Sequence, residues 1–492
     1  MSVKSEKENC VGMIVIDHPP VNALSQSVAE GILVRLAEFE AAADVRSIVI
    51  TATGRTFVAG ADVSEFLSRI EAEDFERGAR LHDLTNRIEG CSKPVVCGLF
   101  GTTLGGGLEL AMACHYRIAM PGTRVGQPEV RLGLIPGAGG TQRLPRLCGI
   151  VKAAELCAFG EMVGVVEARE LGVVDEIAEG DLRVAEIKYA RRVSNDGPRR
   201  TCDRNERLVL TPETQTQLDE IRRLATEKFQ GAQAGGLAVD AVEKSAELAF
   251  EDGLAIENDL FIGALASEEA RNLIQLFFAE RKASKVEFLD LDTEFLVPRS
   301  AGFLQLFSDD VHLVQELIRA DMQLRIVDRR RTAIGDVDFF CIREAEGDLL
   351  GVVEPDCDST IILVTAETFQ AADWKARGFL PANVVGIKYW PHGSRFCEIG
   401  ISEETSAFAL RSVIELVKKL GCAFVVEKPA PFYASQRIKE HRFDESDLQI
   451  EVWKLLNENV IQRASDVDLI QVHCFGHPRH RSNVGWKRGA ES

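Results

Sequence analysis

The segment Pro94–Cys114 constrains the fold of this chain most strongly. It is almost wholly apolar or small, yet it contains three consecutive glycines and one carboxylate, Glu109. Its length would suffice to span a membrane. The glycines make a poor continuous helix, however, and an acid is costly at bilayer depth. We therefore expect no membrane span, but a buried strand, a tight turn and the start of a buried helix.

Residues 12 to 190 alternate strand-like and helix-like patterns. Short apolar or β-branched runs predict strands at Met13–Ile16, Ser47–Thr51, Pro94–Leu99 and Tyr116–Ala119. Between the first two runs, Gln26–Ala42 has apolar residues at helical spacing. Such alternation is typical of an α/β domain.

The rest of the chain predicts further domains, because 492 residues exceed what one hydrophobic core usually supports. From about residue 190 to 290 the pattern is helical and highly charged. A second α/β pattern begins at Gly302, with a strand, a helix from about Asp310 to Ala320 and a strand at Leu324–Val327. Further strands are expected at 360–364, 383–389 and 423–426, and the C-terminal region again looks helical.

Charge and cysteine usage limit the partners and the compartment. A net charge of −19 argues against a nucleic-acid-binding surface. The 12 cysteines include no C-x-x-C pair, which favours free thiols in a reducing compartment and no zinc site. The N-terminus lacks an apolar signal segment and the last three residues are not a peroxisomal address, so we expect a cytoplasmic protein.

Three segments together indicate a catalytic site. The glycines at 105–107 precede a helix start, whose free N–H groups suit a negatively charged oxygen. FVAGADVSEF at 57–66 is a second small-residue turn, and GQPEVRLGLIPGAGG at 126–140 places Glu129 among apolar and glycine residues. Two turns that offer N–H groups, with two acids in apolar settings, favour oxyanion stabilisation with acid/base catalysis.

These segments carry a family resemblance. FVAGAD, GGGLE and GQPEVRLGLIPGAGGTQRLPR, with VNAL at 21–24, resemble the signature segments of the crotonase (enoyl-CoA hydratase/isomerase) superfamily over about residues 10 to 190. The resemblance implies a spiral of ββα units that binds an acyl-CoA. It implies that the N–H groups of Ala61 and Gly106 form the oxyanion hole for the thioester carbonyl. It also places Ala59, Asp62 and Val63 in the CoA-contacting turn.

Both glutamate positions of the family's hydratases are filled. The resemblance implies that Glu109 orients and activates water and that Glu129 handles the Cα proton of a 2-enoyl-CoA, with both carboxylates binding the same water. A single glutamate would suffice to move a double bond from the 3- to the 2-position, so isomerase activity remains an alternative. A noncatalytic acyl-CoA-binding or scaffold protein is another. Taken singly, either glutamate could be structural, because acids also complement helix dipoles or face water.

The second half resembles the NAD-dependent 3-hydroxyacyl-CoA dehydrogenase half of multifunctional and peroxisomal bifunctional fatty-acid oxidation enzymes. LFFAERKASK at 276–285 resembles the joint between the halves, and PRHR at 478–481 resembles a segment of the dehydrogenase's C-terminal region. The expected acid is present as Asp328. The three dinucleotide-fingerprint glycines are replaced by Gln305, Phe307 and Asp310. Their side chains, and the charge of Asp309, would obstruct a pyrophosphate.

Other dehydrogenase positions have also changed. Lys388 stands where the family has its catalytic histidine, and Gln436-Arg437 replaces an Asn-Arg pair. His392 is a possible substitute, but a loop histidine that faces solvent is the simpler interpretation. We therefore predict that NAD binding and hydride transfer are lost and that the protein needs no cofactor and no metal.

The predicted organisation is an α/β chain of four parts. Residues 1–190 form the crotonase domain and 191–295 a helical linker. Residues 296–428 form a degenerate Rossmann-like dehydrogenase-type domain, and 429–492 a helical C-terminal remnant. The second half could take the place of the subunit contacts of isolated crotonases, so we expect a monomer or small homo-oligomer.

Overall fold

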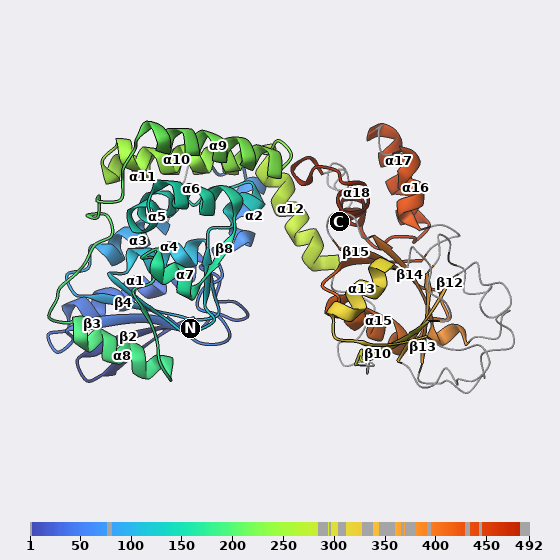
Figure 1. The fold of residues 1–492 in the computed structure, drawn as a ribbon, viewed down its shortest axis with the longest axis horizontal. Helices are drawn as coiled ribbons and strands as arrows, with labels where there is room; N and C mark the ends of the chain where they lie inside the picture. Colours follow the sequence, from blue (N-terminus) through green and yellow to red (C-terminus); the bar gives the residue numbers. More distant parts are fainter. Residues whose placement is uncertain are drawn as a thin grey trace. The chain divides into compact units, whose positions relative to one another are not determined.

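The computed structural model forms two compact units, Met1–Ile274 and Gln275–Ser492, each with its own core (Figure 1). The described residues are 2–75, 81–283, 294, 297–303, 311–326, 338–343, 360–365, 369, 380–390, 395–428, 433–441 and 445–482.

The first unit is built on a six-stranded sheet with the order β1-β2-β3-β4-β6-β9. Its strands are β1 (Val3–Glu8), β2 (Val11–Ile16), β3 (Ser47–Ala52), β4 (Val95–Leu99), β6 (Tyr116–Ala119) and β9 (Glu176–Ile177). Only the β1–β2 pair is antiparallel. Every residue of β2, β4 and β6 is buried, as expected for central parallel strands covered on both faces.

Helices α1 (Gln26–Ala41) and α8 (Leu182–Val193) pack on this sheet. Helix α1 buries Val28, Ile32 and Leu36 at helical spacing, in agreement with the predicted helix. Helix α8 contributes Ile187, Ala190 and Val193 to a cluster with the side chains of β2, β3, β4 and β6. The sheet therefore forms a packed base for the loops that leave its strands.

A second layer carries the segments expected to be catalytic. It contains a three-stranded sheet, β5 (Thr102–Leu104), β7 (Arg124–Gly126) and β8 (Met162–Gly164), in which β7 is central. Its helices are α2 (Val63–Glu71), α3 (Leu81–Glu89), α4 (Gly106–Ala113), the 3-10 turn η1 (Glu129–Leu132), α5 (Gly140–Cys148), α6 (Ile150–Phe159) and α7 (Val165–Glu170). All of α4 is buried, which confirms that the apolar run leads into a buried helix.

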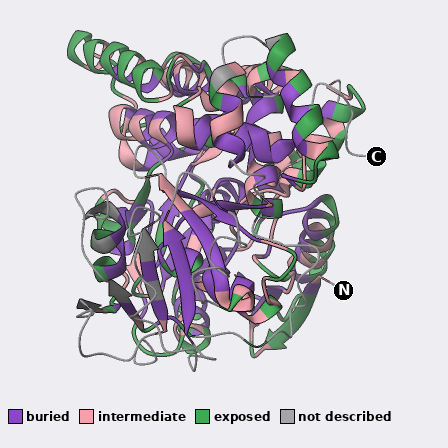
Figure 2. Ribbon diagram, turned by 90° about the vertical axis from the view of Figure 1, so that its right-hand side faces the viewer, coloured by how far each residue is buried: buried purple, intermediate pink, exposed green. Residues whose placement is uncertain are grey.

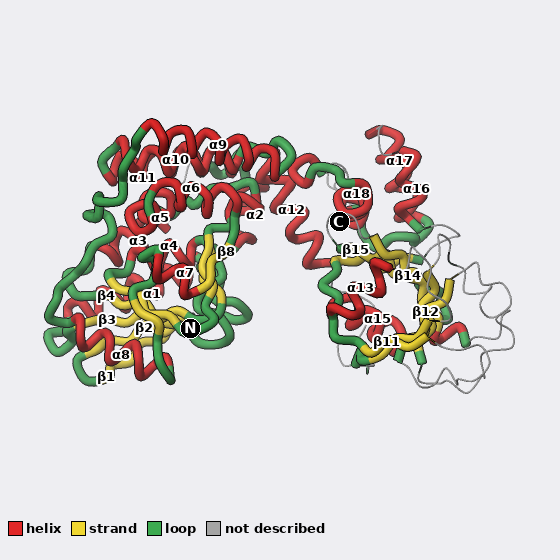
Figure 3. The backbone as a smooth tube through the Cα atoms, viewed as in Figure 1, coloured by secondary structure: helices red, strands yellow, loops and turns green. Residues whose placement is uncertain are grey.

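Three further helices cover α5 and α6: α9 (Pro212–Lys228), α10 (Ala234–Glu247) and α11 (Phe250–Leu265) (Figure 3). Helix α10 buries Ala238, Val239, Ala241 and Val242. These helices lie in the part predicted to be a linker, but they pack within the first compact unit. The end of the crotonase domain at residue 190 therefore stays a prediction from the family resemblance. The first compact unit extends further, to Ile274.

The second unit contains a seven-stranded sheet with the order β11-β10-β12-β13-β14-β15-β16. Its strands are β10 (Ser300–Phe303), β11 (Gln323–Ile326), β12 (Phe339–Arg343), β13 (Ile361–Thr365), β14 (Val384–Trp390), β15 (Phe396–Gly400) and β16 (Ala423–Glu427). Only β14 and β15 pair antiparallel. The described strand residues are largely buried (Figure 2). Strand β10, the first of this sheet in the sequence, lies between β11 and β12. The chain therefore adds β11 on one side of β10 and the remaining strands on the other side.

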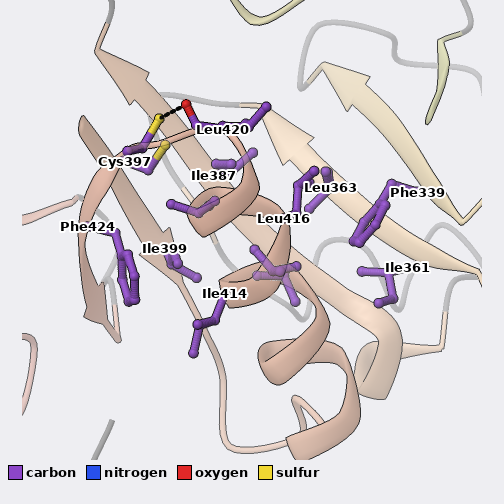
Figure 4. Close-up of a cluster of buried hydrophobic side chains, with 14 of the residues drawn as sticks. Phe339, Ile361, Leu363, Ile387, Cys397, Ile399, Ile414, Leu416, Leu420 and Phe424 are labelled. Atoms are coloured by element: carbon purple, nitrogen blue, oxygen red, sulfur yellow. Dashed lines mark hydrogen bonds between the residues drawn. The ribbon is translucent and has the colours of Figure 1, made fainter. Parts of the chain in front are cut away.

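The helices of the second unit bury apolar faces in two clusters. They are the end of α12 (Glu268–Ala283), α13 (Val311–Arg319), α15 (Ala407–Lys419), α16 (Ala434–His441), α17 (Glu445–Asn457) and α18 (Ser465–Phe475), with 3-10 turns η4 (Pro381–Asn383) and η5 (Arg479–Arg481). Ile414 and Leu416 of α15 pack with Phe339, Leu363 and Ile399 of the sheet (Figure 4). Residues of α12, α16, α17 and α18 form the other cluster.

In the part of the chain that the structure describes, no helix is long and apolar enough to cross a membrane.

Candidate active site

The glycine triplet forms the turn between β5 and α4. Gly105 has φ +49°, a left-handed conformation that favours glycine, and it precedes the first residue of the helix. A Cβ at Gly105 would lie 2.6 Å from Glu129 Oε1, and one at Gly107 would lie 2.2 Å from the carbonyl oxygen of Val58. Gly105 thus allows Glu129, and Gly107 allows Val58, to approach the start of α4.

The N–H groups of Ala61 and Gly106 come from two turns that meet here. A Cβ built on Gly106 would lie 3.4 Å from the nitrogen of Ala61. Hydrogen bonds fix the 58–62 turn, with Leu104 N donating to Val58 O (3.2 Å) and Leu24 N to Gly60 O (2.9 Å). No hydrogen bond from either N–H to another described residue is present. The two predicted oxyanion-hole positions are therefore neighbours, while their binding of a thioester oxygen remains a prediction.

Glu109 lies on α4 and is 2% exposed. Its Oε1 accepts hydrogen bonds from the N–H groups of Ala138 (2.7 Å) and Gly140 (2.8 Å), at the start of α5. Burial raises the pKa of Glu109 to about 7, and the negative charge of Glu257 acts in the same direction, while the two N–H bonds oppose it. Oε2 takes neither of these bonds. Near neutral pH this group can accept or release a proton.

Glu129 begins the 3-10 turn η1, directly after Pro128. Both of its carboxyl oxygens are buried and accept no hydrogen bond from another described residue. Burial holds the pKa of Glu129 well above its usual range, and the negative charges of Glu109 and Glu257 add to this effect. The two predicted catalytic glutamates are thus close enough to influence one another, and Glu129 favours its protonated form.

Two further buried groups border the glutamates. Glu257, from α11, is 0% exposed and accepts the N–H groups of Gly139 (2.6 Å) and Thr141 (2.9 Å). The side-chain amide of Gln127 is also buried, and its Nε2 lies 2.7 Å from a Cβ built on Gly140. We did not predict either residue. The available signal for Glu257 was an acid on the buried stripe Gly253, Leu254, Glu257, Phe261.

The predicted CoA-contacting turn has structural roles of its own. Asp62 is the N-cap of α2, and its Oδ1 accepts from the N–H (3.0 Å) and hydroxyl (2.6 Å) of Ser64. Ala59 and Val63 are half-buried on either side of it. Contact of these three residues with CoA stays a prediction.

Several sequence predictions for the second unit fall on positions that the structure does not describe. Gln305, Phe307, Asp309, Asp310, Asp328 and His392 lie outside the described residues. Lys388 is described: it lies on β14, opposite Glu398 of β15, with its ammonium 5.0 Å from the ring centre of Trp390. Arg437 lies on α16 and pairs with Glu451 (2.6 Å) and Glu458 (2.5 Å).

The layered α/β fold of the first unit, with two glutamates whose carboxyl groups are buried beside two converging backbone turns, defines a crotonase-type domain. Residues 6–234 match the family described as Enoyl-CoA hydratase/isomerase. The probable enoyl-CoA hydratase of Bacillus subtilis (strain 168) is 37% identical over 279 residues, which cover 55% of this chain and 93% of that protein. The chain belongs to the enoyl-CoA hydratase/isomerase family, which confirms the resemblance found in the sequence.

Longer relatives match a similar share of the chain. The human peroxisomal bifunctional enzyme is 37% identical over 288 residues, which cover 58% of this chain and 39% of that enzyme. The chain thus matches well under half of the length of such relatives. Among solved structures, a carnitinyl-CoA dehydratase from Mycobacterium thermoresistibile aligns with 56% of this chain at 22% identity and a TM-score of 0.46.

Proposed function

We propose that this protein adds water syn across the double bond of a 2-enoyl-CoA to give a 3-hydroxyacyl-CoA. The observation that carries the proposal is the pair of buried carboxyls, Glu109 and Glu129, both with a raised pKa. They lie beside the turn that presents the N–H of Gly106 next to that of Ala61. Family membership supports the same type of reaction.

The charge that develops on the thioester oxygen is the first demand of this reaction. As water attacks Cβ, electron density moves from the double bond toward the carbonyl oxygen. Two N–H groups fixed by the backbone stabilise that charge without having to reorganise. Ala61 and Gly106 supply such donors, and Gly106 adds the positive end of the α4 dipole.

The two proton transfers are divided between the glutamates. Glu109, whose pKa is about 7, takes a proton from water as the oxygen bonds to Cβ. Glu129, which favours its protonated form, gives its proton to Cα. One turnover leaves the proton on Glu109 instead of Glu129, and exchange between the two carboxyls or with solvent restores the starting state. Delivery from one face accounts for the syn geometry.

The direct test is loss of the conjugated thioester absorbance when the purified protein meets 2-enoyl-CoAs of short, medium, long and aromatic acyl groups. Turnover with formation of the 3-hydroxyacyl-CoA supports the proposal. Absence of turnover with all of them would overturn it. Supplying a 3-enoyl-CoA and observing the conjugated product would favour the isomerase alternative, for which Glu129 alone could move the proton. Tight binding without either reaction would favour a noncatalytic acyl-CoA-binding protein.

For the second unit, we propose a dehydrogenase-derived domain that no longer binds NAD. Two observations support this interpretation: the strand order, in which the chain reverses across the sheet at β10, and Lys388 in the position expected for a catalytic histidine. NADH formation from NAD and a 3-hydroxyacyl-CoA would contradict it. We further propose a reducing, cytoplasmic location, since all the cysteines that the structure describes are free thiols, and a monomer or small homo-oligomer.

A further inference from the structure

The turn at residues 138–141 divides its N–H groups between two carboxylates. Ala138 and Gly140 donate to Oε1 of Glu109, at 2.7 and 2.8 Å. Gly139 donates to Oε1 of Glu257 at 2.6 Å, and Thr141 donates to Oε2 at 2.9 Å. Four consecutive amides thus point alternately to a side chain of α4 and to a side chain of α11.

The backbone of this turn explains the alternation. Gly139 has φ +90°, and a Cβ there would lie 1.8 Å from Nη1 of Arg143, so the position strongly favours glycine. A Cβ at Gly140 would lie 2.7 Å from Oε1 of Glu109. Because α5 begins at Gly140, its free N–H groups and positive dipole end stabilise anions on both sides of the turn.

The carboxylate of Glu257 is fully engaged by the protein. The hydroxyl of Thr141 donates to its Oε2 at 2.5 Å, in addition to the Thr141 N–H. His82 Nε2, from α3, lies 2.9 Å from Oε1, which also accepts from Gly139. Glu257 is 0% exposed. Its oxygens are occupied by these partners, so it can act on the reaction only through the turn and through its charge.

The charge of Glu257 acts on both glutamates of the site. It raises the pKa of Glu109, second only to burial, and it also raises the pKa of Glu129. His82 opposes the effect on Glu109. Among the described residues, Arg143 of α5 also brings a charged side chain against the turn; it donates to Ala138 O at 3.1 Å and pairs with Glu89 of α3 at 2.8 Å.

We propose that Glu257 is a positioning residue for hydration: together with His82 and Thr141 it clamps the 138–141 turn, which in turn holds Glu109 in the orientation that activates water. This inference rests on the proposed function. It adds a third carboxylate, from a helix beyond the signature segments, to the machinery of the site.

The test compares Glu257→Gln with the wild type and with Asp259→Asn, a matched change at an exposed acid of the same helix. Glu257→Gln retains the shape but presents an amide N–H to a backbone N–H, so the turn must shift. Since small misplacements of a catalytic group can be costly, kcat should fall by about 100-fold with KM little changed. The acidic limb of the pH–rate profile should also move to lower pH, because a negative charge near Glu109 is lost. Asp259→Asn should change neither.

A second, milder variant distinguishes the proposed role of Glu257 from an effect of misfolding. Thr141→Val removes one donor to Glu257 and leaves the charge, so kcat should fall by a smaller factor, about 3- to 10-fold for one lost hydrogen bond, with no shift of the acidic limb. A wild-type kcat and an unmoved acidic limb in Glu257→Gln would overturn the proposal. So would a loss of activity in Glu257→Gln without any shift of the acidic limb, because the charge of Glu257 would then have no effect on Glu109.

Amide hydrogen exchange separates this inference from the proposed function, since it needs no substrate. Peptides that cover residues 137–141 should exchange faster in Glu257→Gln than in the wild type, while peptides from β2 should be unchanged. If the wild type fails to hydrate any 2-enoyl-CoA, the proposed function fails, and the exchange rates still decide whether Glu257 clamps the turn. Equal exchange in both proteins would refute the clamp.

Discussion

The carboxyl of Glu129 occupies the space that a side chain at Gly105 would need: its Oε1 lies 2.6 Å from the point that a Cβ of residue 105 would occupy. The glycine therefore does more than supply the positive φ of the turn. It leaves room for the carboxyl that is expected to protonate Cα.

Gly105→Ala should for this reason lose activity beyond its cost in stability. The positive φ alone should destabilise the fold by about 1 kcal/mol, and the clash with Glu129 should displace the carboxyl and lower kcat. Gly54→Ala is the matched control, since Gly54 has φ +90° with nothing within 4 Å of its Cβ position. Equal kcat values in the two variants, measured with denaturation curves for each, would show that Glu129 does not need this space.

Replacing either of the two glutamates proposed to be catalytic should remove a proton transfer and leave binding intact. We expect Glu109→Gln and Glu129→Gln each to lower kcat by about 100- to 10,000-fold with little change in the affinity for the CoA ester. Steady-state kinetics and direct binding of the product measure the two effects. Glu170→Gln, at an exposed acid, serves as the control. Near-wild-type turnover in either site variant would eliminate the two-glutamate mechanism.

The pH dependence of hydration should be bell-shaped. Activity should rise with pH as Glu109 ionises, with an acidic limb near its pKa of about 7. It should fall at higher pH as Glu129 loses its proton, because the pKa of Glu129 is held well above the ordinary value. The two limbs belong to the coupled pair. In Glu129→Gln the alkaline limb should disappear from the residual activity, and its persistence would assign that limb to another group.

Burial of Glu129 should also link stability to pH. Its folded-state pKa is raised, so the stability contribution is complete below the unfolded value near 4.5 and is lost as pH rises through the folded pKa. Glu129→Gln does not lose stability in this way, because glutamine does not ionise. The difference obtained by subtracting the Tm of the wild type from that of Glu129→Gln should therefore be more positive at about pH 8 than at about pH 5. Thermal scans at both values measure the difference, and a difference independent of pH would contradict the assignment.

Local patterns predict the parts of this site that lie within one segment. The predicted strands at Met13–Ile16 and Tyr116–Ala119 fall within β2 and on β6, since buried parallel strands are apolar along their length. Residues 105–109 contain both the N–H of Gly106 and the carboxylate of Glu109, so their proximity follows from one turn. Family motifs supplied the pairing with Ala61.

The contribution of Glu257 could not be predicted in this way. Its partner Gly139 lies 118 positions earlier, and helical periodicity indicates which face of α11 is buried but not which element covers that face. The acid on that face was visible in the sequence. Its meaning depends on how α11 packs against α5, which is a tertiary property.

The clamp on the 138–141 turn bears on how such a domain can be inherited. Residues 1–190 include both glutamates proposed to be catalytic and all the signature segments, but they lack α11. A gene fusion or domain exchange that broke the chain at residue 190 would transfer the motifs and separate them from Glu257. The segment that can move between proteins as a working module therefore extends through α11, to the limit of the first compact unit at Ile274.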